Sequence, residues 1–94
     1  MYAVVRTYSG QGASALFDVL AQREADVKDV ISGVPGFVSY VAFRTEGGGT
    51  AVTICRDKAG ADESSRRAVA WTKENVSTTV DAPTIAEGST IIDF

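Results

Sequence analysis

Residues 36–56 of the chain read GFVSYVAFRTEGGGTAVTICR, and this stretch decides the fold. Its two halves, residues 37–45 and residues 50–56, are rich in the β-branched and aromatic residues that are typical of strands. Between them, the three consecutive glycines at residues 47–49 permit the positive φ angles of a tight connection. The stretch therefore predicts a β-hairpin.

The segments before this hairpin predict a strand followed by a helix. Residues 2–9 mix β-branched and aromatic residues without a helical repeat, and a Gly-Gln-Gly triplet ends that strand. In residues 13–32 the apolar residues recur every three or four positions, which places them on one side of a single helix. Gly33 and Pro35 then supply the glycine cap and the proline that commonly end a helix.

The segments after the hairpin predict a second helix and a last strand. Asp57 or Asp62 can cap a helix that runs to about residue 78. Residues 85–94 predict the last strand, with a bulge or bend near Glu87.

The order of these elements is β-α-β-β-α-β, the split βαβ arrangement of ferredoxin-like folds. It predicts an α+β fold in which two helices cover one face of a four-stranded antiparallel sheet. A length of 94 residues allows one domain, so we expect a single ferredoxin-like domain over residues 1–94.

Both faces of the predicted sheet carry apolar side chains. In the strand at residues 37–45, Phe37 and Phe43 point to one side, whereas Tyr40 and Ala42 point to the other. An antiparallel sheet with one solvated face normally alternates between apolar and polar residues instead. Because two helices cover only one face, we predict that a second copy of the chain covers the other. The predicted assembly is a homodimer formed through the sheet face.

The composition excludes several classes of function. The chain has no histidine, which removes histidine-based nucleophile pairs and imidazole ligation of metal or haem. Its one cysteine, Cys55, cannot form an intrachain disulfide, which predicts a cytoplasmic location and an inert core thiol. A net charge of −3 without a basic patch argues against a nucleic-acid partner. No run of apolar residues is long enough to span a membrane.

No metal or cofactor is expected either. The sequence GQGASA at residues 10–15 formally fits a dinucleotide fingerprint, GxGxxA. That fingerprint should be accompanied by an acidic residue at the end of the next strand, about 20 positions later. Asp29 has this spacing but falls inside the predicted helix, so an ordinary strand–helix turn is the better interpretation.

Trp71, the only tryptophan, marks the first candidate site. Arg67 lies one turn before it and Asn75 one turn after it on the predicted second helix. The three residues can present a cation, a flat ring and an amide to a ligand held between helix and sheet. In the alternative interpretation, Trp71 packs on the sheet and the other two residues lie at the rim.

A second set of candidates lies on the strands. Tyr40 and Arg44 share a sheet face by the two-residue repeat and can line one cavity, where an arginine can hold a carboxylate or an enolate oxygen. Alternatively, Arg44 pairs with Glu46 or with an acidic residue of a partner chain at the dimer seam. Arg6 and Tyr8 on the first strand can likewise bury their stems and expose their polar tips.

The element order, the opening Gly36-Phe37-Val38-Ser39-Tyr40 of the second strand, and the lone Trp71 resemble a known family. This is the antibiotic-biosynthesis-monooxygenase-like superfamily of dimeric α/β-barrel proteins, and in particular its small members without an assigned function. The element order covers nearly all 94 residues. The resemblance implies that two ferredoxin-like subunits pair their sheets into a barrel, with a ligand pocket between the helices and the sheet of each.

Characterised proteins of this superfamily include cofactor-independent monooxygenases that oxidise phenolic polyketides, and haem-degrading enzymes. The helix tryptophan that they share matches Trp71. The polyketide oxidases place an asparagine one turn earlier, where this chain has Arg67, and Asn75 can replace that amide from the other side. Haem degradation requires an axial histidine and a first-strand asparagine, but this chain has no histidine and reads RTY at residues 6–8. The resemblance therefore does not extend to haem degradation.

These observations predict a dimeric α/β-barrel protein that acts as a small-molecule-binding or structural module without catalysis. A small aromatic compound is the expected ligand. The alternative is a cofactor-independent monooxygenase acting on a phenolic or quinone-type aromatic substrate, in which Arg67 stabilises the substrate anion and Trp71 shapes the pocket. A cavity beside Trp71 of about 300 Å³ or more would favour a ligand at that site.

Overall fold

The computed structural model describes all of residues 1–94. The chain forms four strands and three helices in the order β1 (Tyr2–Ser9), α1 (Ala13–Gln22), α2 (Glu24–Ser32), β2 (Phe37–Thr45), β3 (Gly48–Cys55), α3 (Lys58–Asn75) and β4 (Thr84–Ser89).

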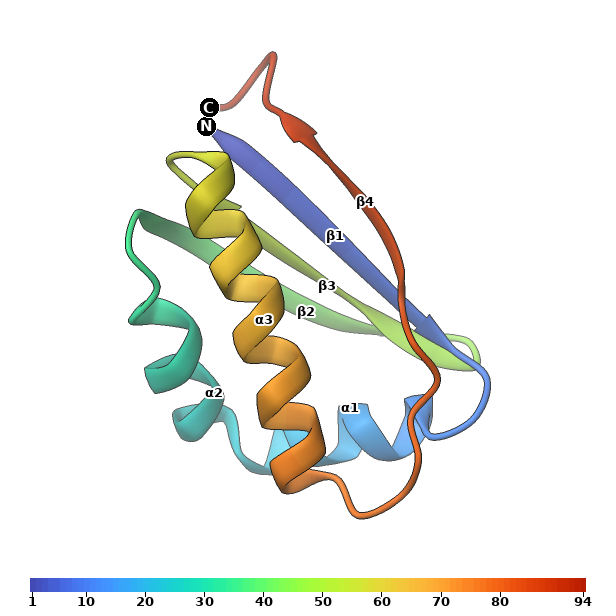
Figure 1. Cartoon of the computed structure of the whole chain (residues 1–94). Helices are drawn as coiled ribbons and strands as arrows, with labels where there is room; N and C mark the ends of the chain where they lie inside the picture. The colour runs from blue at the N-terminus through green and yellow to red at the C-terminus, as the bar shows by residue number, and fades with distance from the viewer.

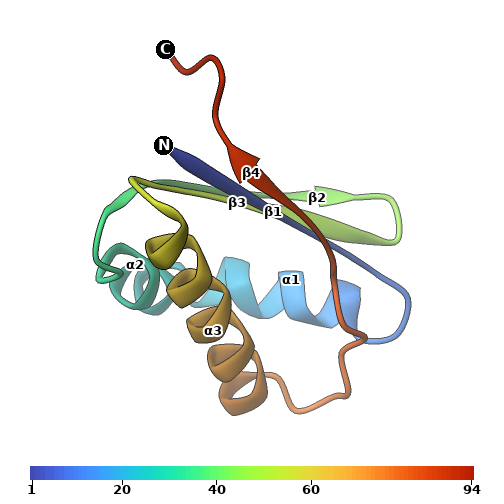
Figure 2. The ribbon, with the colours of Figure 1, turned by 45° about the horizontal axis from the view of Figure 1, so that its top comes forward.

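The four strands form one antiparallel sheet in the order β2-β3-β1-β4. The helices all lie on the same face of this sheet, so the domain has two layers (Figures 1 and 2). α1 packs on β3, α2 on β2, and α3 on β3 and β1. The predicted α+β class and ferredoxin-like architecture are confirmed, and the other face of the sheet carries no element of this chain.

The predicted single helix over residues 13–32 is wrong, because the chain leaves the helical conformation at Arg23 (φ −118°, ψ 38°). The Arg23 guanidinium bonds to Asp26 and to Asn75 of α3, and it lies 6.0 Å from the centre of the Trp71 ring. A straight helix of 20 residues would be about 30 Å long. Because of the bend, α1 and α2 can each pack an apolar side against the sheet. Arg23, at the junction of the two helices, contacts α3 through Asn75.

The last strand is shorter than predicted. It ends at Ser89 rather than at residue 94, after which the Thr90 amide donates to the Met1 carbonyl oxygen. Its pairing with β1 is continuous, so the bulge expected near Glu87 is absent. The tail beyond it leaves the sheet on the side away from the helices (Figure 2) and exposes the apolar side chains of Ile91, Ile92 and Phe94.

The faces of β2 follow from its pairing with β3. Tyr40 lies opposite the buried Thr53, and Ala42 lies opposite the buried Ala51, so both point toward the helices. Val41 and Phe43 share one side, as predicted, and this side is the open face. Phe37 does not share their face, because the register shifts between Phe37 and Ser39. The shift moves Phe37 opposite Cys55 and onto the helix side.

The core between the layers depends on one close approach of helix and strand. The ring of Phe17 packs edge-on against Tyr8, with ring centres 5.9 Å apart, in a cluster that includes Leu16 and Trp71. A Cβ added to Gly49 would lie 2.3 Å from the Phe17 ring. Glycine at this position of β3 therefore allows α1 to sit close to the sheet.

Replacing Gly49 by alanine is expected to lower the free energy of unfolding by about 1–3 kcal/mol, because the buried Phe17 ring must shift to admit the methyl group. Urea unfolding at one fixed protein concentration measures this change. The matched control is Gly88→Ala on β4, where an added Cβ meets nothing within 4 Å. Equal unfolding midpoints for the two variants would contradict this account of Gly49.

Candidate functional site

A long apolar groove runs between the helices α1 and α2 and the edge strand β2. Its volume is about 780 Å³, within the range of small-molecule sites. Ten of its fifteen lining residues are hydrophobic, and the lining is formed by Phe17, Leu20, Ala21, Glu24, Val27, Lys28, Ile31, Ser32, Phe37 and residues 39–44. The groove exists because β2 is an edge strand whose helix-facing side is only partly covered.

Tyr40 and Arg44 both lie on the helix-facing side of β2 and line this groove. Tyr40 is half-buried, and burial raises the pKa of its phenol, so the hydroxyl is protonated at neutral pH. Arg44 is exposed at one end of the groove and forms an ion pair of 2.6 Å with Asp18 of α1. Within this chain Arg44 thus pairs with Asp18 of α1, and not with Glu46 as in the alternative interpretation. The two strand candidates are brought together at one cavity.

Trp71 lies elsewhere, in the core between α3 and the sheet, with 8% of its surface exposed. The cavity beside it has a volume of only about 30 Å³, which is room for one or two water-sized groups. That space is far below the 300 Å³ that a ligand site beside Trp71 would need. The structure therefore places Trp71 in packing contact with the helix–sheet core.

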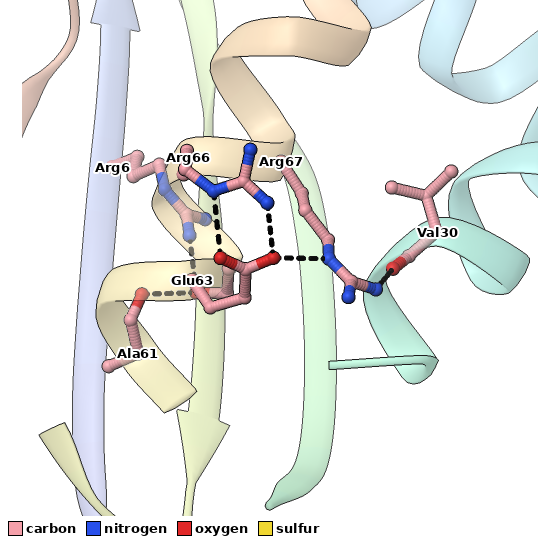
Figure 3. Close-up of polar contacts among 7 residues, drawn as sticks. Arg6, Val30, Ala61, Glu63, Arg66 and Arg67 are labelled. Carbon is pink, nitrogen blue, oxygen red and sulfur yellow. Dashed lines mark hydrogen bonds and ion pairs between the residues drawn. The ribbon is translucent and has the colours of Figure 1, made fainter. Parts of the chain in front are cut away.

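Arg67 is held by groups of its own chain and lines neither cavity. Its guanidinium donates to Glu63, at 2.8 Å, and to the carbonyl oxygen of Val30 in α2, at 3.1 Å (Figure 3). Glu63 also accepts from Arg66, and these hydrogen bonds lower the pKa of its carboxyl group to about 2. Arg67 thus links α3 to α2 rather than pointing to a ligand.

Asn75 is likewise engaged. Its side-chain oxygen accepts a hydrogen bond from Arg23, and its amide nitrogen donates to the backbone carbonyl oxygen of Trp71, at 2.9 Å. It lines neither cavity. The three helix candidates share one region of α3, but no cavity of ligand size lies between them.

Arg6 is a strand residue whose burial the sequence did not lead us to expect. Its polar tip was expected to reach solvent, but the side chain is buried with 2% of its surface exposed. It lines the small cavity together with Tyr8 and Tyr40. The burial of Arg6 could have been predicted from the two-residue repeat of β1, because positions 4, 6 and 8 lie on the same face of the strand and Val4 and Tyr8 face inward.

The remaining reactive groups are few. Cys55 is fully buried, and burial raises the pKa of its thiol, as expected of an inert core residue. No group of three or more histidine, cysteine, aspartate or glutamate side chains could hold a metal ion. No helix has both the length and the apolar character needed to cross a membrane. Within the groove the charged residues are Glu24, Lys28 and Arg44.

Comparisons with known proteins give matches only at the level of structure. No protein-family model matches the chain, and no curated protein matches its sequence. A protein of unknown function from Nitrosomonas europaea is similar in structure, with a TM-score of 0.68 and 16% identity over 99% of this chain and 90% of that one. An EthD family protein from Bacillus halodurans is similar with a TM-score of 0.58 and 14% identity, over 97% of this chain and 99% of that one.

A third similar structure is that of SnoaB, a cofactor-independent oxygenase from Streptomyces nogalater. It has a TM-score of 0.47 and 15% identity, over 98% of this chain and 95% of that one. The first two likenesses cover nearly the whole of both chains, and they confirm at the level of the fold the resemblance inferred from the element order. The chain therefore has the ferredoxin-like fold of these proteins, with the helices on one face of the sheet and the other face open.

Proposed function

We propose that this protein is a homodimeric small-molecule-binding module without catalysis, whose ligand is a small aromatic compound. The groove between α1, α2 and β2 is the observation that carries this proposal. It is large enough for a two- or three-ring compound, and most of its lining is hydrophobic. Phe17, Phe37 and Tyr40 line it and offer ring surfaces against which an aromatic ligand can pack.

Tyr40 and Arg44 are the sequence-derived candidates that this proposal retains as ligand contacts. Arg44 holds one end of the groove through its ion pair with Asp18, and that pair is exposed. An exposed pair of this kind contributes little to stability. Its guanidinium is therefore available for a polar substituent of the ligand at little cost.

Filling the groove is expected to abolish ligand binding. Ala42 points toward the helices and lines the groove, so an Ala42→Trp side chain would occupy the space of the ligand. With 2-naphthamide as an uncharged aromatic probe, isothermal titration calorimetry should show a loss of affinity of about tenfold or more. Unchanged affinity in this variant would contradict binding in the groove.

The matched control is Ala70→Trp. Ala70 is an exposed alanine of α3 that lines neither cavity, so the same substitution there should leave the affinity for 2-naphthamide unchanged. Loss of binding in both variants would show that the added indole acts in some way other than by filling the groove.

The homodimer part of the proposal rests on the open face of the sheet. Val5, Val52 and Ile54 lie on this face, and Val41 and Phe43 are each about half exposed. Contiguous apolar surface of this kind marks interaction sites on soluble proteins. The apolar tail after β4 leaves on the same side of the sheet (Figure 2), which adds to the surface that a second copy can cover.

The alternative function, a cofactor-independent monooxygenase, needs a group that stabilises the anion of a phenolic substrate. Arg67 was expected in that role, but Glu63 and the Val30 carbonyl hold it away from both cavities. Arg44 and Arg6, the two arginines that do line a cavity, can each hold a polar or anionic group of a bound ligand, and the binding module requires no more than this. In an oxygen-consumption assay with hydroquinones or anthrones, we expect the wild-type protein to show no activity above background. Activity in the wild-type protein that disappears in the Trp71→Phe variant would instead favour the enzyme.

We further propose a cytoplasmic location, which the single buried thiol of Cys55 fits.

A further inference from the structure

The buried guanidinium of Arg6 has no counter-ion. It donates hydrogen bonds to three hydroxyl oxygens, those of Ser65 at 3.3 Å, Thr53 at 3.2 Å and Ser64 at 2.8 Å. These bonds use three of the five N–H groups that a guanidinium carries. The chain has five ion pairs, and Arg6 takes part in none of them.

A buried charge is expected to be paired, because removing it from water costs free energy that hydroxyl dipoles only partly return. Burial lowers the pKa of Arg6, yet an arginine side chain stays protonated at neutral pH. The small cavity that Arg6 lines therefore lies in a positive field. No aspartate or glutamate is among the residues that line this cavity.

Two phenols line the same cavity, those of Tyr8 and Tyr40. Neither hydroxyl forms a hydrogen bond to a protein group, whereas the third tyrosine, Tyr2, donates to Glu87 at 3.1 Å. Burial raises the pKa of both phenols, so each is a protonated donor at neutral pH. Arg6, Tyr8 and Tyr40 thus contribute one cation and two phenols to a lining in which ten of the twelve residues are hydrophobic, the phenols included, and the volume of about 30 Å³ suits the oxygen atoms of one anionic group.

We propose that Arg6, Tyr8 and Tyr40 form a carboxylate-binding site at the inner wall of the groove, so that the ligand is an aromatic acid. This inference rests on the proposed function, because the ring system of the acid would lie in the groove. The small cavity and the groove share Tyr40 and Leu20 in their linings, as well as Val27 and Ile31, so the two spaces are neighbours. A carboxylate offers the planar pair of oxygen atoms that a guanidinium binds best.

The test compares two probes of the same shape, 2-naphthoate and the uncharged 2-naphthamide, by isothermal titration calorimetry at neutral pH. The wild-type protein should bind the naphthoate about tenfold or more tightly than the amide. Arg6→Met, which keeps an unbranched apolar stem, should reduce this preference to about one. An undiminished preference in Arg6→Met would overturn the inference.

A second variant tests the same site without removing the buried charge. Tyr8→Phe retains the ring that packs on Phe17 and removes only the hydroxyl, and it should lower the naphthoate preference several-fold. The matched control is Tyr2→Phe on the same strand, whose hydroxyl bonds to Glu87 outside the cavity and whose loss should leave the preference unchanged. Equal preferences in the two phenylalanine variants would also overturn the inference.

The failure of this inference is distinguishable from the failure of the proposed function. If the wild-type protein binds both probes equally well, the carboxylate site is refuted and the aromatic groove stands. If it binds neither probe, the proposed function is refuted and the carboxylate site with it.

Discussion

Replacing Val41 by glutamate is expected to convert the proposed dimer into a monomer of 9.9 kDa. Val41 is 56% exposed in the single chain, and it lies on the open face opposite Val52 of the neighbouring strand. In a dimer that packs sheet against sheet, this position is buried. One carboxylate from each protomer would then lie in an apolar interface without a partner, which costs several kcal/mol per charge.

Size-exclusion chromatography with light scattering at micromolar concentration measures this effect. The wild-type protein should have about twice the 9.9 kDa mass of the chain. The matched control is Val69→Glu on α3, where the valine is 49% exposed but belongs to the helix layer, and this variant should remain dimeric. A monomeric wild-type protein, or a dimeric Val41→Glu variant, would contradict an interface on the open face.

Replacing Arg6 by methionine is expected to stabilise the ligand-free protein by about 2 kcal/mol. The substitution removes a buried cation that has no counter-ion and leaves an apolar side chain of similar length in the core. The three hydroxyl groups lose only an interaction in which they accept, and Ser64 keeps its own bond to the Ala61 carbonyl oxygen. For a domain of this size the gain corresponds to a rise in Tm of about 10 °C.

Urea and thermal unfolding at one fixed protein concentration measure the effect of Arg6→Met. The control is Arg66→Met, which removes an exposed arginine paired with Glu63 and should change stability by less than about 0.5 kcal/mol. Strong destabilisation by Arg6→Met would instead show that the hydrogen bonds of Arg6 to the three hydroxyl groups stabilise the fold.

The sequence predicted the type and order of the elements because local patterns decide them. The glycine run between residues 45 and 50 and the apolar repeat of residues 13–32 were sufficient for that purpose. The break at Arg23 could not be read from the same repeat, because the apolar spacing continues across it. At the break Arg23 contacts Asn75 and Trp71, which lie about 50 positions away and which only the folded chain brings near.

The candidate site also contains residues whose positions local patterns predict and residues whose positions depend on distant partners. The two-residue repeat of β2 was sufficient to place Tyr40 and Arg44 on one face, and the groove confirms that placement. Arg67 and Asn75 were chosen from helical spacing alone, but partners on α2 and at Arg23 engage them in the folded chain. The polar tip of Arg6 was predicted to be exposed because charged side chains are mostly found at the surface. Its hydroxyl partners on β3 and α3 could not be predicted from local sequence.

The central claim is that the groove between α1, α2 and β2 binds a small aromatic ligand, and a titration followed by two-dimensional ¹H–¹⁵N NMR tests it most directly. On addition of 2-naphthamide to the wild-type protein, we expect saturable shift changes in the groove, at residues such as Val27, Ile31 and Ala42. Changes confined to the open face, around Val5 and Val52, or the absence of any saturable change, would contradict the claim.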